Sequence, residues 1–176
     1  KRPEPIPVFA EMSSINPVIL LPESLKKNYQ HTAAALVGSI TLGAGQFCTN
    51  PGLIIAIEND ALKKFISELE KGITATMPDP MLNAGIATNY YKKLENALAQ
   101  KGVIIEAQVT WEAPKGKPVI ASAPAEEFLK NPALAEEVFG PFSLIIRCRD
   151  NDQLHTVLSK LHGQLTATIM ADNSEI

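Results

Sequence analysis

Cysteine is scarce in this chain. Its two cysteines, Cys48 and Cys148, stand far apart, and neither belongs to a CxxC pair or has a histidine at metal-ligand spacing. A disulfide framework and a zinc site are therefore not indicated, and we expect no bound metal. Two unpaired cysteines of this kind fit a reducing, cytoplasmic setting.

The sequence also lacks long runs of one character. No apolar run approaches the roughly 20 residues that a membrane-spanning helix needs, and no signal peptide is recognisable. With a net charge of −3 and no long basic run, the chain has no electrostatic footprint for nucleic acid. We therefore expect neither a membrane nor a nucleic acid as partner.

What is present is an ordinary globular composition. The 176 residues include 45% hydrophobic and 20% charged residues, which is typical of a soluble domain. A chain of this length fits one domain and buries about 70% of the surface that its unfolded form exposes. It begins Lys1-Arg2-Pro3 without Met and ends after a strand-like run, so we expect it to be a piece of a longer protein.

Strand-like and helix-like runs alternate along the chain. The continuous apolar run 18–21 is typical of a strand covered on both faces. Pro22 and Glu23 then open a helix, because proline suits the first turn and an acid suits the positive end of the helix dipole. The same reasoning predicts strands at 6–10, 18–21, 53–57, 103–105, 119–121 (an edge strand), 142–147 and 165–170, helices at 22–44, 60–71 (ended by Gly72), 83–101 and 150–161, and a surface loop at 111–117. This alternation favours an α/β fold with a mainly parallel sheet flanked by helices.

One cysteine stands in a short loop between a helical run and a strand run. The loop reads Gly45-Gln46-Phe47-Cys48-Thr49-Asn50-Pro51-Gly52. Gly45 lets another backbone come close, and Pro51 and Gly52 form turns, so the Cys48 sulfur is displayed as a candidate nucleophile. Free cysteine more often behaves as a small buried hydrophobe, and we expect this of Cys148 in the core.

Three segments together resemble the aldehyde dehydrogenase superfamily. Gly45-Gln46-Phe47-Cys48 resembles its G-Q-x-C signature. Glu11-Met12-Ser13-Ser14-Ile15-Asn16-Pro17 resembles the block E-L-G-G-K-S-P, and Glu136-Glu137-Val138-Phe139-Gly140-Pro141 resembles E-E-I-F-G-P. The segments follow the order of the family and span most of the chain, which makes the resemblance specific. It implies the catalytic domain of that superfamily.

The resemblance assigns the chemistry to two residues. It implies that Cys48 attacks the aldehyde carbon, helped by its own backbone N–H at the oxyanion, and that Glu11 is the base that activates water against the thioester. Thiolate is a strong nucleophile, and its thioester is labile enough to hydrolyse. Taken alone, a glutamate at a strand end is most often a solvated charge.

The resemblance also implies a nicotinamide cofactor, NAD or NADP. Glu137 matches the glutamate that binds the nicotinamide ribose, and Phe139 matches the aromatic residue beside the nicotinamide. Gln46 and Phe47 flank the nucleophile, and we expect them to line the aldehyde tunnel.

The first block departs from the family pattern. Ser13 and Ser14 replace two glycines and Ile15 replaces the usual lysine, while Asn16 and Pro17 are interpreted as structural. Such variants resemble the branch that contains 2,5-dioxovalerate (α-ketoglutarate semialdehyde) dehydrogenases and NADP-dependent fatty aldehyde dehydrogenases. The expected substrate is therefore an aldehyde such as 2,5-dioxovalerate.

The resemblance further implies a domain division. Residues 1–12 are expected to be the last strand of an otherwise absent dinucleotide-binding domain, and residues 13–176 a catalytic domain truncated at its C-terminal part. The piece alone is expected to be inactive, and the full-length enzyme to be a homo-oligomer.

Two alternatives stay open, a catalytically silent folding or oligomerisation module and a thiol hydrolase that uses Cys48. A hydrolase needs a histidine against Cys48, whereas His31, His155 and His162 lie within or beside predicted helices. We expect all three histidines at the surface or partly packed.

Overall fold

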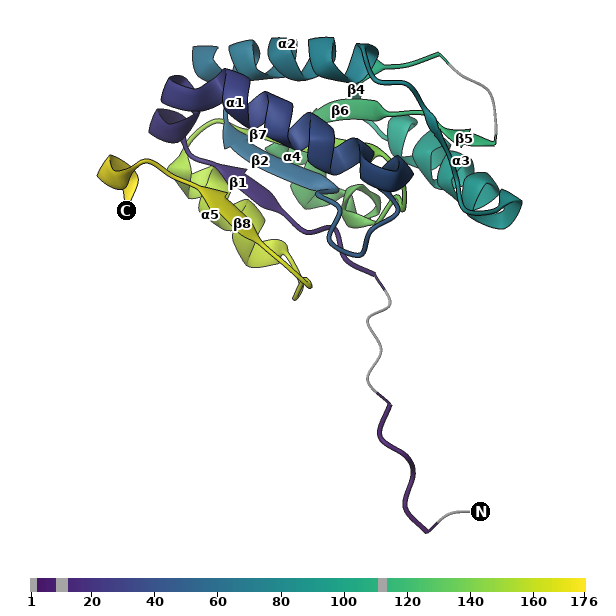
Figure 1. The fold of residues 1–176 in the computed structure, drawn as a ribbon. Coiled ribbons are helices and arrows are strands. Elements are labelled where there is room, and N and C mark those ends of the chain that lie inside the picture. The colour runs from purple at the N-terminus through teal and green to yellow at the C-terminus, as the bar shows by residue number, and fades with distance from the viewer. Residues whose placement is uncertain (1–2, 9–12, 111–113) are drawn as a thin grey trace.

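The computed structural model describes residues 3–8, 13–110 and 114–176, and Figure 1 shows a twisted sheet between helices. The strands are β1 (Val18–Leu20), β2 (Leu53–Ile57), β4 (Ile104–Gln108), β6 (Val119–Pro124), β7 (Phe142–Cys148) and β8 (Thr168–Met170). Their order in the sheet is β4-β6-β7-β2-β1-β8, and every neighbouring pair is parallel except β4 with β6. The predicted α/β class with a mainly parallel sheet is confirmed.

Helices cover both faces of this sheet. α1 (Pro22–Thr41) and α2 (Asp60–Thr74) pack on one face, while α3 (Ala84–Leu98), α4 (Ala125–Lys130) and α5 (Asn151–Lys160) contribute to the core on the other. Three short 3₁₀ turns are η1 (Leu42–Gly45), η2 (Pro132–Ala135) and η3 (Asn173–Glu175). A separate two-stranded ribbon pairs β3 (Asp79–Pro80) with β5 (Lys115–Gly116).

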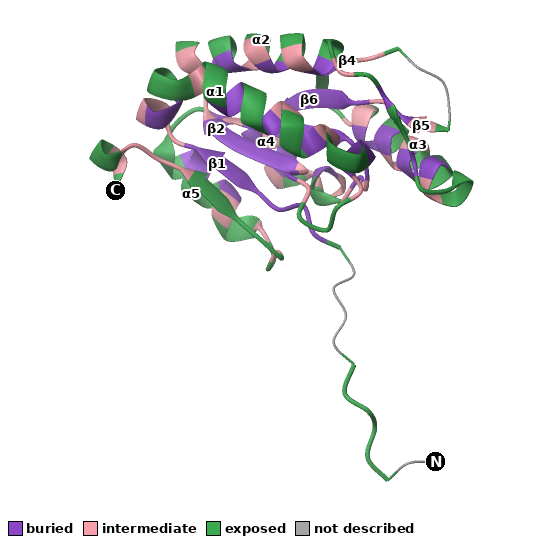
Figure 2. Ribbon diagram, viewed as in Figure 1, coloured by how far each residue is buried: buried purple, intermediate pink, exposed green. Residues whose placement is uncertain are grey.

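The central strands are apolar throughout because both of their faces are covered. On β2, Ile54 and Ala56 belong to the core under α1 and α2, whereas Leu53 and Ile55 belong to the core on the opposite face. All four are at most 1% exposed, and Figure 2 shows the central strands as buried and the outer faces of the helices as exposed. This arrangement explains why 18–21 and 53–57 read as continuous apolar runs rather than as alternating ones.

Three helices begin at residues whose side chains cap them. The side chain of Asn59 accepts the N–H of Leu62 at 2.9 Å and caps α2, and Asn83 and Asp150 cap α3 and α5 in the same way. Gly72 does not end α2 as predicted. A Cβ at that position would lie 2.5 Å from Val37 Cγ2, so glycine there allows α1 to approach, and the helix continues to Thr74.

Other predictions at the sheet edges need correction. β6 is not an edge strand, because β4 turns back after α3 and pairs antiparallel outside it. Residues 6–8 of the predicted strand 6–10 have no regular structure, and the rest of that range lies outside the described residues. The predicted loop 111–117 is partly the strand β5, while 111–113 lie outside the described residues. α4 was not predicted, because only six residues form it.

The described helices also bear on the membrane question. Among the residues with described structure, no helix combines the length and the apolar character that crossing a membrane requires.

The C-terminal turn η3 fastens the start of α1. Leu21 occupies the N-cap position without a side-chain bond, and the Glu175 carboxylate instead accepts the N–H groups of Glu23 and Ser24 at 2.7 and 3.0 Å. Lys27 Nζ lies 2.7 Å from Asp172 Oδ2. A carboxylate at a helix N-terminus satisfies unpaired donors and complements the dipole.

This contact predicts an acid-sensitive contribution to stability. Hydrogen bonds from Lys27 and Ser174 lower the pKa of Asp172 from 3.8 to about 2. Because the folded-state pKa lies below the unfolded one, the stabilisation is present above the unfolded pKa and is lost as pH falls through the folded pKa. We expect Asp172→Asn to flatten the decline in unfolding free energy between about pH 4 and about pH 2, measured by urea denaturation. Asp60→Asn, which removes a surface partner of Lys63, is the control and should leave that decline in place.

Candidate active site

The three motif segments meet at one edge of the sheet. Residues 13–17 lead into β1, residues 45–52 into β2 and residues 136–141 into β7. These three strands are parallel neighbours in the order β7-β2-β1, so their amino ends lie side by side. Segments that are far apart in the sequence thereby form one site.

Glycines allow the backbones of these segments to touch. Gly45 has φ +66°, and a Cβ there would lie 2.3 Å from the carbonyl carbon of Gly140. The Gly52 N–H donates to Ile15 O at 3.0 Å. No side chain fits between Gly45 and Gly140, so the predicted close backbone approach at Gly45 is confirmed.

Cys48 lies exposed in a tight turn of the second segment. The N–H of Asn50 donates to Phe47 O at 3.0 Å and closes the turn. The side-chain amide of Asn16 donates to Cys48 O at 2.8 Å and to Asn50 O at 2.9 Å. The loop is therefore held through its backbone, while the thiol stays on the surface.

The backbone of Asn16 has a positive φ, a conformation that few residues other than glycine adopt. Its φ is +44° and it is 3% exposed, a region that asparagine tolerates better than most residues. Its Oδ1 accepts a hydrogen bond from the Ser14 hydroxyl at 2.8 Å and another from the N–H of Thr166 at 3.2 Å. Both ends of this amide are thus engaged, and the structural role predicted for Asn16 amounts to fixing the cysteine loop.

Ser14 does more than replace a glycine. It is 4% exposed, and its hydroxyl accepts the N–H of Leu165 at 2.9 Å while facing Asn16. Gln164 Oε1 accepts the N–H of Ile15 at 2.7 Å. Sequence reasoning missed this link between the first block and residues 164–166, since only their polarity next to a strand could have indicated it.

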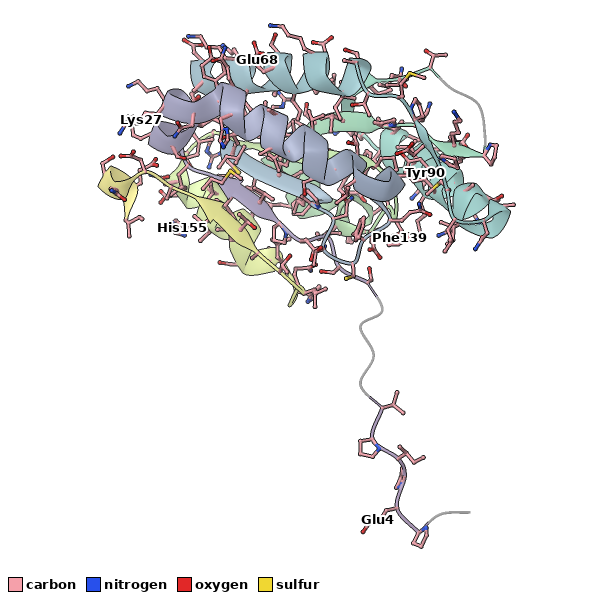
Figure 3. All side chains as sticks on the ribbon, viewed as in Figure 1. Glu4, Lys27, Glu68, Tyr90, Phe139 and His155 are labelled. Carbon is pink, nitrogen blue, oxygen red and sulfur yellow. The ribbon has the colours of Figure 1, made fainter. Side chains whose placement is uncertain are left out.

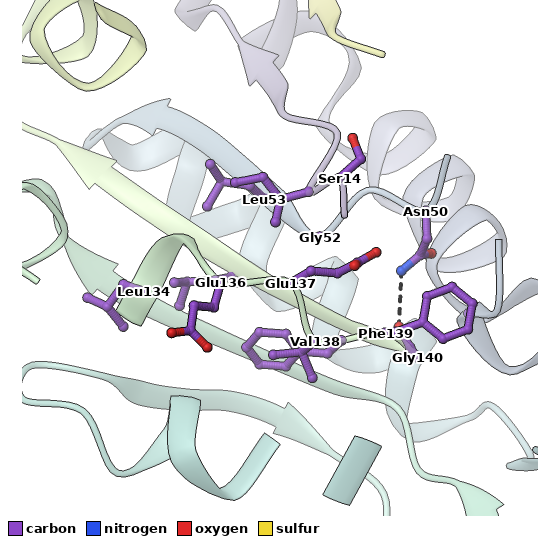
Figure 4. A pocket seen from close by; sticks show the side chains of 14 residues that line it. Ser14, Asn50, Gly52, Leu53, Leu134, Glu136, Glu137, Val138, Phe139 and Gly140 are labelled. Atoms are coloured by element: carbon purple, nitrogen blue, oxygen red, sulfur yellow. Dashed lines mark hydrogen bonds between the residues drawn. The ribbon is translucent and has the colours of Figure 1, made fainter. Parts of the chain in front are cut away.

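The two acids of the third segment point in different directions. Glu136 forms an ion pair with Lys93 at 2.9 Å, whereas Figure 4 shows the Glu137 carboxylate extending toward Asn50. Glu137 and Phe139 are both half-buried and line one pocket, together with Asn50. The pocket holds about 20 Å³, room for little more than one water, so a larger ligand must lie against its mouth.

Asn50 connects the cysteine loop to the third segment. Its Nδ2 donates to Gly140 O at 3.0 Å, as Figure 4 shows. Its Oδ1 is buried without a hydrogen-bond donor in the described parts of the chain. This amide therefore holds Glu137–Pro141 beside Cys48 through one bond.

Gln46 and Phe47 contact the turn before them. Gln46 Nε2 donates to Gly43 O at 2.8 Å, and its Oε1 accepts the N–H of Leu82 at 2.8 Å. The Phe47 ring packs against Gly43 and is exposed at the surface. Their lining of an aldehyde tunnel stays a prediction.

The other cysteine, the three histidines and Glu11 complete the set of residues considered from the sequence. Cys148 is fully buried, and burial raises the pKa of its thiol to about 12, so the prediction of a core cysteine is confirmed. His31, His155 and His162 are exposed, as expected. Glu11 lies outside the described residues. Within the described ranges no three His, Cys, Asp or Glu side chains are grouped as a metal site.

The Asn16 amide predicts a specific loss of stability. Asn16→Asp keeps an acceptor toward Thr166 but replaces the donor to Cys48 O and Asn50 O with an oxygen. We expect the unfolding free energy to fall by about 2 to 4 kcal/mol, because two part-buried carbonyls lose the donor that they share. Denaturant titration measures it. Asn83→Asp is the matched control, since Asn83 only accepts a bond, and an equal loss in both variants would contradict the role of Asn16.

Comparison with known proteins agrees with this geometry. The aldehyde dehydrogenase family profile matches residues 4–175. The chain is 44% identical to alpha-ketoglutaric semialdehyde dehydrogenase 2 of Azospirillum brasilense and 42% identical to alpha-ketoglutaric semialdehyde dehydrogenase of Acinetobacter baylyi, over 97% and 99% of its length. It spans about a third of these curated relatives, 33% and 34%.

A solved structure shows the same fold. It is that of a putative methylmalonate-semialdehyde dehydrogenase from Sinorhizobium meliloti complexed with NAD, which matches with a TM-score of 0.77 at 14% identity, over 93% of this chain and 35% of that one. The motifs, their convergence at one edge of the sheet and these similarities lead to one conclusion: the chain belongs to the aldehyde dehydrogenase family.

Proposed function

We propose that the chain is the catalytic part of an NAD(P)-dependent dehydrogenase that oxidises an aldehyde to a carboxylic acid through a thioester on Cys48. One observation carries this proposal. The exposed Cys48 stands on a loop that contacts both the Asn16 segment and the Glu137–Pro141 segment. A nucleophile and the residues expected to face the cofactor are thereby held in fixed relative positions, as a reaction between bound partners requires.

The roles of the residues follow from this arrangement. In this proposal the Cys48 thiolate attacks the flat carbonyl carbon, and its backbone N–H stabilises the oxyanion, a contribution of about 3 kcal/mol when well aimed. Once this adduct has lost its hydride and become a thioester, Glu11 takes a proton from the water that releases the acid. Cys48 leaves the acyl carbon as thiolate and is ready again.

The residues beside the cysteine loop suit a nicotinamide nucleotide. Glu137 offers a carboxylate that accepts hydrogen bonds from ribose hydroxyls, and Phe139 offers a flat apolar ring, both half-buried at one pocket. When bound, the nicotinamide supplies a hydride acceptor. The chain's own part is to hold the ribose at Glu137 and to keep the aldehyde carbon on Cys48 within reach.

We further propose 2,5-dioxovalerate as the substrate, because the relatives above are named for this semialdehyde. Since the chain covers about a third of those relatives, residues 13–176 are proposed to form most of a catalytic domain, and residues 1–12 to belong to a dinucleotide-binding domain. In this proposal the full-length enzyme is a cytoplasmic homo-oligomer, and the 176 residues alone show no turnover.

The assignment of the nucleophile predicts the outcome of an aldehyde panel. The full-length protein, assayed with NAD or NADP by the absorbance of reduced nicotinamide, should oxidise 2,5-dioxovalerate better than simple alkanals. Cys48→Ala should lower the rate at least about 10⁴-fold, as expected when a covalent nucleophile is removed. Cys148→Ala is the control. It should retain the rate and lose about 1 kcal/mol of stability. Full activity in the Cys48 variant, or thiol-dependent ester hydrolysis by a full-length protein that oxidises no aldehyde with either nucleotide, would contradict the proposal.

Glu11 should act after hydride transfer. In Glu11→Gln of the full-length protein we expect a stoichiometric burst of reduced cofactor followed by slow turnover, because the thioester forms and then waits for an activated water. Stopped-flow absorbance measures both phases. Steady turnover without a burst would contradict this order of steps.

A further inference from the structure

Tyr90 lies on α3, outside the three motif segments, and contacts one of them closely. It is fully buried, and a Cβ added to Gly140 would lie 2.3 Å from Tyr90 Cδ2. The peptide after Gly140 in turn lies against Gly45, where an added Cβ would be 2.4 Å from Pro141 N. The Tyr90 ring therefore packs against the third segment at Gly140, where that segment also contacts Gly45 of the cysteine loop. Figure 3 shows Tyr90 and Phe139 at the same end of the sheet.

The hydroxyl of Tyr90 ties two strand starts together. It donates to Lys117 O at 2.6 Å and lies 3.5 Å from Pro141 O. Pro141 O also accepts the N–H of Val119 at 2.9 Å. Lys117 precedes β6 and Pro141 precedes β7, so one hydroxyl fixes the amino ends of both strands. Burial raises the pKa of this hydroxyl, which keeps it a neutral donor.

Its neighbour Tyr91 differs in one respect. The two rings meet edge to face with centroids 5.4 Å apart, and the Tyr91 hydroxyl also binds backbone in the 115–117 stretch, donating to Lys115 O. The atoms nearest to a Cβ added at Gly140 belong to Tyr90, and the Tyr90 hydroxyl lies 3.5 Å from Pro141 O. The chain thus provides an adjacent tyrosine with a similar bond to the 115–117 stretch for comparison.

We propose that Tyr90 is a positioning residue that sets the spacing between Cys48 and the Glu137–Phe139 side of the site. The proposal rests on the proposed function, because it assumes that Glu137 and Phe139 receive the nicotinamide end of the cofactor. Asn50 holds this segment by one bond to Gly140 O, and the Tyr90 ring and hydroxyl hold it from the α3 side. A segment freed on that side must be ordered when the nucleotide binds, and this ordering weakens affinity.

The test compares Tyr90→Phe with Tyr91→Phe in the full-length protein. Each variant loses one hydroxyl and keeps its ring, so both should fold, and both should lower the melting temperature by a few degrees. Isothermal titration calorimetry with NAD and with NADP then measures the dissociation constant without any turnover. We expect Tyr90→Phe to weaken nucleotide binding about fivefold or more, the worth of one hydrogen bond, and Tyr91→Phe to stay within about twofold.

A second measurement reports how firmly the third segment is held. Hydrogen exchange of the nucleotide-free protein should be faster at the amides of residues 138–140 and 142 in Tyr90→Phe and unchanged there in Tyr91→Phe. Equal binding constants for wild type and Tyr90→Phe, or equal weakening in both variants, would overturn the role of Tyr90 and leave the proposed function intact. A wild-type protein that binds neither nucleotide would instead contradict the proposed function, and the role of Tyr90 with it.

Discussion

The side-chain amide of Asn16 is the interaction on which the candidate site depends. It holds the carbonyls of Cys48 and Asn50 with its nitrogen and the Ser14 and Thr166 groups with its oxygen. A buried amide of this kind is stabilising only when its donors and acceptors are satisfied together. The geometry of the cysteine loop is therefore coupled to two other stretches of chain, the Ser14–Asn16 stretch and the one that contains Thr166, and a displacement of either is transmitted to Cys48.

The site lies at an unusual end of the sheet. Open α/β sheets usually bind ligands outside the carboxyl ends of their strands, where helix N-termini supply donors. Here the motif segments precede β1, β2 and β7, so the cysteine loop lies at the amino ends. The carboxyl end of β1 is followed by α1, whose first N–H groups are taken by Glu175. Side-chain amides and glycine contacts, rather than a helix N-terminus, thus hold the loops of this site.

Local pattern was enough to predict most of the fold. Continuous apolar runs identified β1, β2 and β7, and Asn59, Asn83 and Asp150 cap the helices at the expected places. The failures lie where a distant contact decides. β6 is not at the edge only because β4 folds back beside it, and the glycine at position 72 stands inside its helix where Val37 of α1 leaves no room for a side chain. The local sequence around β6 and Gly72 predicts neither feature.

The same distinction applies to the site. Cys48, Glu137 and Phe139 were identified as candidates because they stand in contiguous motifs. The supporting roles of Ser14, Gln164 and Tyr90 are recognisable only from contacts across 27 to 151 positions of sequence. Residues that carry chemistry are restricted in type and therefore leave a local signature. Residues that hold them in place need only the right shape and one donor or acceptor, which many sequences can supply. The supporting residues of such a site are thus set by the fold, and a close packing partner such as Gly140 against Tyr90 can identify one that no motif contains.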